Sequence, residues 1–181
     1  MSQATVKQSL LKTINAIQDN PDLSKVVFRA ETTLVEDVLC SVQIRDFPPM
    51  VIDEPPELGG NDAGVNPVEL ILAALGTCQE IVYSAYASVM DIPLDSVQVN
   101  VKGYLDLKGL LGMDESVPAG YSQITFEALL ESSADDESLR KLIDTVESHC
   151  PVLDILCREQ NIKGVAKVGG RQIHRIQSKA A

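Results

Sequence analysis

Residues 66–90 read NPVELILAALGTCQEIVYSAYASVM, and the predicted fold is organised around this run. Asn66 can cap the free N–H groups of a first helical turn, and Pro67 is favoured at the first position of a helix. The run is apolar almost all round, which is typical of a helix buried at the centre of a domain. We therefore predict a central helix that begins at Pro67 and ends before the Asp-Ile-Pro stretch at 91–93.

The chain before this helix predicts a further helix, two strands and a long loop. Residues 5–19 place apolar side chains on one helical face, which indicates an amphipathic helix. Residues 25–34 and 38–47 are rich in β-branched residues and favour strands. Residues 48–66 contain four prolines and three glycines, so we expect a loop there. A long loop within a compact domain is often a functional one.

The chain after the central helix alternates between predicted strands and helices. Valines alternate with polar residues over 97–107, which predicts a half-buried strand, and residues 121–131 predict a second one. Ser132 or Ser133 is expected to cap a helix with an acidic first turn, which suits the helix dipole. The Cys-Pro step at 150–151 breaks that helix and can start another.

The C-terminal stretch predicts a short strand over 165–170, followed by a basic end that is expected to fray. This order of elements indicates an α+β fold in which a sheet wraps a central helix. We divide the chain into an N-terminal helical extension over 1–22, a folded domain over 23–172 and a C-terminal tail over 173–181.

The composition argues against several classes of function. The 181 residues include 15 Lys+Arg and 26 Asp+Glu, for a net charge of −11, so neither nucleic acid nor an anionic membrane is an expected partner. The longest apolar stretch, residues 70–77, is too short to span a bilayer, and the N-terminus lacks the apolar run of a signal peptide. We expect a cytoplasmic protein whose cysteines are reduced.

The cysteines are the residues best suited to carry chemistry. Cys78 lies in the second half of the central helix, where it either packs as a small apolar residue or reacts. Cys150 lies at a helix break, where the N–H groups of the next helix can lower the pKa of a thiol. The two could meet as an attacking and a resolving pair. Cys40 and Cys157 are expected to pack in the core.

Metal and cofactor chemistry are not expected. The spacing of His149, Cys150 and Cys157 matches none of the compact patterns of structural zinc sites. The sequence also lacks a Gly-rich phosphate loop that follows a strand and opens a helix.

Two motifs carry a family resemblance. The stretch DEPPELGGNDAGVNPVELILAALGTC at 53–78, followed by ESHCPVLDIL at 147–156, resembles the OsmC/Ohr superfamily of osmotically inducible and organic-hydroperoxide-resistance proteins. The resemblance extends from about residue 25 to residue 170. It implies an OsmC-like fold, in which antiparallel sheets wrap central helices in an intertwined homodimer with active sites shared between subunits. The predicted N-terminal helix is extra to it.

The resemblance also implies an activity. Cys78 would attack the O–O bond of an alkyl or fatty-acid hydroperoxide, and its sulfenic acid would condense with Cys150 to a disulfide that a dithiol reduces. Relatives activate the first cysteine with an Arg held by a Glu. The position of that Glu is Val68 here, so we consider the neighbouring Glu69, together with Arg29 and Arg45, as candidate activating residues.

Two other interpretations remain open at this point. A relative with the same fold and cysteine pair could work as a redox-sensing or small-molecule-binding protein without peroxidase activity. The other is a dimeric protein whose cysteines only pack in the core. Both interpretations stay open because a fold does not determine a function.

Overall fold

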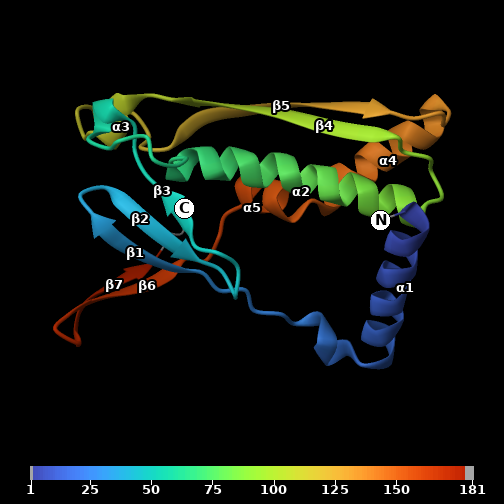
Figure 1. The fold of residues 1–181 in the computed structure, drawn as a ribbon, viewed down its shortest axis with the longest axis horizontal. Helices are drawn as coiled ribbons and strands as arrows, with labels where there is room; N and C mark the ends of the chain where they lie inside the picture. The colour runs from blue at the N-terminus through green and yellow to red at the C-terminus, as the bar shows by residue number, and fades with distance from the viewer. Residues whose placement is uncertain (1, 178–181) are drawn as a thin grey trace.

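The central helix α2, Pro67–Val89, organises the computed structural model, which describes residues 2–177 (Figure 1). The Asn66 side chain accepts a hydrogen bond from the Glu69 N–H at 2.9 Å, and the Glu69 carboxylate accepts one from the Asn66 N–H at 2.9 Å. This reciprocal capping box satisfies two of the free N–H groups of the first turn. The predicted start of the helix at Asn66-Pro67 is therefore confirmed.

Two layers pack on α2. The antiparallel pair β4, Ser96–Leu105, and β5, Tyr121–Glu131, covers one face, and the short helix α3, Leu107–Leu110, lies in the loop between them. Helices α4, Asp136–His149, and α5, Pro151–Cys157, lie on another side of α2 (Figure 1). The buried core lies between these elements and contains Tyr83, Ala87, Ile92, Leu142 and Val146.

A close backbone approach fixes the distance between α2 and β4. A Cβ atom added to Gly76 would lie 3.3 Å from the Val101 side chain and 3.5 Å from the Val99 carbonyl oxygen. The Glu80 side chain accepts a hydrogen bond from the Val99 N–H at 3.0 Å, one turn further along α2. A small residue at position 76 therefore lets the helix lie directly on the strand.

The remaining strands form two antiparallel units away from this core. One is a three-stranded sheet with the order β1, Glu31–Glu36, β2, Leu39–Gln43, and β3, Met50–Ile52. The other is a hairpin of β6, Lys163–Val168, and β7, Arg171–Gln177. The strands β1 and β2 pack on one another rather than on α2, and both units lie on the side of α2 opposite β4 (Figure 1). The fold is thus α+β with antiparallel sheets, as predicted.

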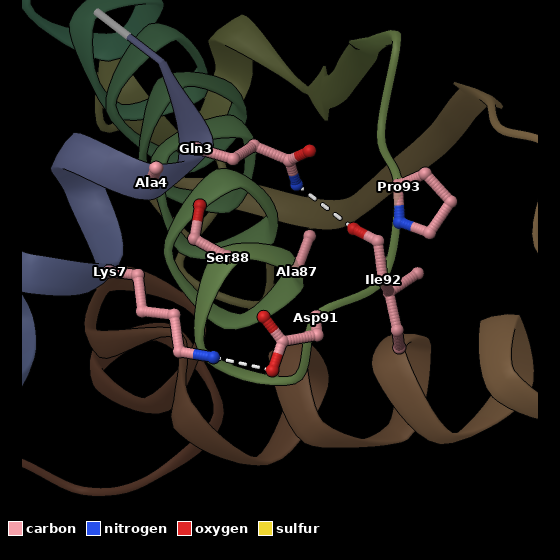
Figure 2. A pocket seen from close by; sticks show the side chains of 8 residues that line it. All are labelled: Gln3, Ala4, Lys7, Ala87, Ser88, Asp91, Ile92 and Pro93. Atoms are coloured by element: carbon pink, nitrogen blue, oxygen red, sulfur yellow. Dashed lines mark hydrogen bonds and ion pairs between the residues drawn. The ribbon is translucent and has the colours of Figure 1, made fainter.

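Helix α1, Gln3–Asp19, packs on the C-terminal end of α2 (Figure 2). The Gln3 amide donates a hydrogen bond to the Ile92 carbonyl at 2.9 Å, and Lys7 forms an ion pair with Asp91. Ser88 and Ala87 complete the wall of a pocket of about 320 Å³ between the two helices. A short 3₁₀ turn, Pro21–Ser24, follows α1 and leads the chain toward β1.

Three sequence-based expectations are wrong at element ends. Residues 25–30 form no strand, because no partner strand lies beside them within residues 2–177. Asp135, rather than Ser132 or Ser133, caps α4: its carboxylate accepts a hydrogen bond from the Ser138 N–H at 2.9 Å.

The third concerns the C-terminal end, which does not fray over 171–177 but forms β7. Gly169 and Gly170 have φ values of 55° and 77°, and two consecutive left-handed residues make a tight hairpin turn. The Gly-Gly pair therefore joins two strands instead of ending one. The last four residues of the expected tail, 178–181, lie outside the described residues.

The expectation that α2 is buried all round holds for only part of its surface. Its buried residues lie toward the sheet and the other helices, whereas Ile71 is 39% exposed and Ile81 is 68% exposed. Among the described helices, α2 alone has the length and hydropathy of a membrane span. The uninterrupted apolar stretch at 70–77 was too short to indicate this. It nevertheless packs against β4, α4, α1 and α5 in this structure.

A buried carboxylate, that of Asp53, holds the loop before α2 together by hydrogen bonds to its backbone. Asp53 accepts hydrogen bonds from the backbone N–H groups of Glu54 at 2.9 Å, Asn61 at 2.9 Å and Ala63 at 3.1 Å. A Cβ atom added to Gly60 would lie 1.8 Å from the Glu54 carbonyl oxygen, so only glycine fits this turn. The N–H groups of Ala63 and Asn61 hold the pKa of Asp53 below its usual range.

We predict that Asp53→Asn lowers the melting temperature at neutral pH and weakens its dependence on acid pH. The folded-state pKa of Asp53 is lowered, so its stabilisation is complete above the unfolded pKa of about 4 and is lost as the pH falls through the folded pKa. Calorimetric scans from about pH 7 to pH 3 would measure both effects. Asp144→Asn, at an exposed position on α4, is the control. Equal acid sensitivity of the wild type and Asp53→Asn would contradict this role.

Candidate active site

The structure brings Cys78 and Cys150 together. Cys78 lies on α2, and Cys150 lies at the junction of α4 and α5, 72 positions later (150 − 78 = 72). The Cys78 side chain lies beside the Cys150 thiol, close enough to raise its pKa. A pair of thiols in contact can interconvert between a dithiol and a disulfide, because disulfide chemistry proceeds by attack of one sulfur on another.

The surroundings of Cys150 keep its thiol protonated. The residue is fully buried, and Pro151 begins α5 immediately after it. Burial raises the pKa of Cys150, while the N–H of Leu153 partly offsets burial and the contact with Cys78 raises the pKa further. The helix break therefore lowers the pKa less than the sequence indicated, since burial outweighs the N–H donors.

Cys78 differs from Cys150 in its accessibility. It is only partly buried, so a small molecule from solvent can approach it more easily than it can approach the fully buried Cys150. The two cysteines thus form an asymmetric pair, one partly buried and one fully buried.

The pair lies at the end of the buried core. Tyr83 and Val146 belong to the core, and the Tyr86 ring lies 5.2 Å from the His149 ring, centroid to centroid. The His149 ring nitrogen Nδ1 is within 2.9 Å of the Thr145 carbonyl oxygen, which it can reach as a donor. Packing between α2 and the last turns of α4 therefore sets the position of Cys150 relative to Cys78.

One buried polar residue, Gln79, was not predicted from the sequence; it follows Cys78 on α2. Its side chain is fully buried, and both its amide nitrogen and its amide oxygen lack hydrogen-bond partners within residues 2–177. Leaving a buried amide group unpaired costs about 1–3 kcal/mol. A glutamine in an otherwise apolar stretch of helix was the signal that could have identified it.

Glu69, a candidate activating residue, lies at the N-terminal end of α2. Its carboxylate closes the capping box with Asn66, and its negative charge contributes, after burial, to the raised pKa of Tyr121. It thus lies nine positions, about two and a half turns, before Cys78 on α2.

Arg29 and Arg45 share one pocket. Arg29 precedes β1 and Arg45 follows β2, so both lie outside the strands in which the sequence placed them. They line a pocket of about 410 Å³ together with Val27, Phe28 and other residues of this segment. Neither Cys78 nor Cys150 lines it. The Arg45 guanidinium lies 4.6 Å from the centre of the Phe47 ring, over its face.

The other two cysteines lie apart from the pair. Cys40 is half-buried in β2, and Cys157 is exposed at the end of α5, so the expectation of core packing is wrong for Cys157. Across residues 2–177, no group of three or more His, Cys, Asp or Glu side chains is arranged to hold a metal ion.

Comparison with known proteins places this site in a family. Residues 59–163, which include both Cys78 and Cys150, match the family described as OsmC-like protein. A hydroperoxide reductase of Mycoplasma genitalium is 27% identical over 100 residues, which cover 55% of this chain and 67% of that protein.

Solved structures share the fold. An OsmC-like protein from Mycoplasma pneumoniae superposes with a TM-score of 0.62 at 19% identity, covering 73% of this chain and 88% of that one. An organic hydroperoxide resistance protein OsmC from Legionella pneumophila gives a TM-score of 0.56 at 19% identity, covering 74% and 92%. The chain therefore belongs to the OsmC-like protein family.

Proposed function

We propose that this protein is a thiol-dependent peroxidase that reduces organic hydroperoxides. The observation that carries the proposal is the contact between the partly exposed Cys78 and the buried Cys150. The relative named hydroperoxide reductase and the organic hydroperoxide resistance protein with the same fold support a role connected with peroxide.

The proposed reaction has two steps. The Cys78 thiolate attacks one oxygen of the O–O bond, so that an S–O bond forms, the O–O bond breaks and the leaving alkoxide takes up a proton. Cys150 then attacks the sulfur of the resulting sulfenic acid, the S–S bond forms and water leaves. A dithiol reductant supplies the two electrons that restore both thiols.

The roles follow from burial. Cys78 meets the hydroperoxide because it is the more exposed of the two thiols. Cys150 resolves, because burial keeps it away from the oxidant and raises its pKa, so it stays a thiol until a sulfenic acid forms beside it. The neighbours of Cys78 on α2 are mainly apolar, which favours alkyl or fatty-acid hydroperoxides over hydrogen peroxide.

We further propose that the protein works as a cytoplasmic homodimer with shared active sites. The outer face of α2 exposes Ile71 and Ile81, and an apolar surface of this kind is stabilised by a partner. Arg29 and Arg45 flank strands of the β1 to β3 sheet, and this sheet does not pack on α2 of its own chain. In a dimer, this sheet could supply a cation to the thiols of the second copy.

We predict that Cys78→Ser abolishes turnover of cumene and linoleic-acid hydroperoxides with dihydrolipoamide as reductant. Cys150→Ser should retain a single reaction with hydroperoxide but lose turnover, because its sulfenic acid has no resolving thiol. Steady-state and single-turnover assays separate the two outcomes, and Cys157→Ser, which changes a thiol outside the pair, should behave like the wild type. An inert wild type that still forms a reversible Cys78–Cys150 disulfide would instead support the redox-sensing alternative.

We predict that Ile81→Asp dissociates the dimer. A carboxylate on the exposed apolar face of α2 would lose its hydration at an interface, while it costs little in a free protomer. Sedimentation equilibrium should give the mass of one chain for this variant and of two chains for the wild type. Lys141→Asp, at an exposed position on α4, should remain dimeric. A monomeric wild type would remove the proposed assembly.

We predict that Arg29→Leu or Arg45→Leu lowers kcat/KM by about 100-fold, the loss typical of removing one group that stabilises developing charge. The same variant should slow alkylation of the Cys78 thiol by iodoacetamide at neutral pH in a Cys150→Ser background, because a nearby cation favours the reactive thiolate. Arg140→Leu, on exposed α4, serves as the control. Unchanged kinetics in both variants would assign activation to another group.

A further inference from the structure

The proposed reaction assigns no role to Gln79. Its side chain is completely buried, and both polar atoms of its amide lack partners within the described chain. A buried amide that only filled space would be replaced at lower cost by an apolar side chain of the same size. The amide therefore indicates that a polar group lies beside the Gln79 side chain in another state of the protein.

The packing of α2 on α4 places Gln79 at the level of the thiol pair. Tyr83 on α2 and Val146 on α4 belong to the same buried core cluster, and residues four apart lie one above the other on a helix. Gln79 lies one turn before Tyr83 on α2, and Cys150 lies four positions after Val146. Cys78, in contact with Cys150, directly precedes Gln79 on α2.

The proposed reaction at Cys78 creates a polar group, the sulfenic acid, that the Gln79 amide can bind. When a hydroperoxide transfers one oxygen to sulfur, the thiol becomes S–O–H, which carries both an acceptor oxygen and a donor proton. A glutamine amide offers a donor N–H and an acceptor carbonyl from one planar group. It can therefore donate to the sulfenic oxygen and accept the sulfenic proton, and it has neither partner among residues 2–177 of the reduced protein.

We propose that Gln79 is a positioning residue that holds the sulfenic acid of Cys78 by this pair of hydrogen bonds. The inference rests on the proposed function for the origin of the sulfenic oxygen. Gln79 exchanges no electrons: the hydroperoxide O–O bond is reduced and the Cys78 sulfur is oxidised, as above. By binding the oxygen, the amide retains the sulfenic acid until Cys150 attacks and slows its further oxidation to sulfinic acid.

The test uses Gln79→Met in the full-length Cys150→Ser protein, where the sulfenic acid cannot be resolved. Methionine matches glutamine in size but makes no such hydrogen bonds. After one equivalent of cumene hydroperoxide, dimedone trapping and mass spectrometry measure the lifetime of the sulfenic acid. With excess hydroperoxide, the same spectra give the rate of sulfinic acid formation.

We expect the lifetime to shorten and overoxidation to accelerate by about tenfold, the change expected for losing a hydrogen bond of ordinary strength. The melting temperature of Gln79→Met should be equal to or above that of the parent, because an unpaired buried amide is removed. Gln98→Met, at an exposed position on β4, should change neither quantity. Gln79→Leu, which also removes both hydrogen-bonding groups, provides a second variant if Gln79→Met does not fold.

An unchanged lifetime and overoxidation rate in a folded Gln79 variant would overturn the inference, as would a parent protein in which Cys78 forms no dimedone adduct. Failure of the proposed function is a separate result, seen as absence of turnover in the wild type with dihydrolipoamide. A wild type that does not turn over but forms the adduct still allows the lifetimes to be compared.

Discussion

The packing of α2 against α4 and α5 is the contact on which the rest of this molecule depends. It buries Tyr83, Ala87, Leu142 and Val146 in one cluster, and it carries Cys150 to the side of Cys78. Because protein interiors are close-packed, this core tolerates little displacement of one helix along the other. The distance between the two sulfurs is thus set by apolar packing rather than by any interaction of the thiols themselves.

The same burial gives the two sulfurs different properties. Removing Cys150 from water raises its pKa, and the N–H groups at the start of α5 only partly compensate. Burial also leaves the Gln79 amide unpaired, at a cost that an apolar residue would not have incurred. Functional sites often keep such locally unfavourable arrangements, since activity and maximal stability select different residues.

The outward parts of the chain complement this core. The sheet of β1 to β3 and the hairpin of β6 and β7 lie away from β4 and β5, and their apolar residues are widely exposed. Val26, Val27 and Phe28 form an extended run without strand pairing, although their side chains favour a sheet. These surfaces agree with the proposal of a second copy, which would cover the apolar residues and provide partners for unpaired backbone groups.

Elements whose signals are local could be predicted from the amino-acid sequence. Residue types and their spacing predicted the start of α2 at Asn66-Pro67, the alternation in β4 and the break before Pro151, because each depends on neighbouring residues. The sequence also identified the two cysteines and the family that carries them.

Only the tertiary structure decided that Cys78 and Cys150 touch, that Gln79 is buried without partners and that residues 25–30 remain unpaired. The physical reason is that these properties depend on segments far apart in the chain. The periodicity of one segment shows which face is apolar, but not what packs on that face or which polar group is enclosed there. The packing of β4, β5, α4 and α5 around α2 determines what covers each face and which polar group is enclosed.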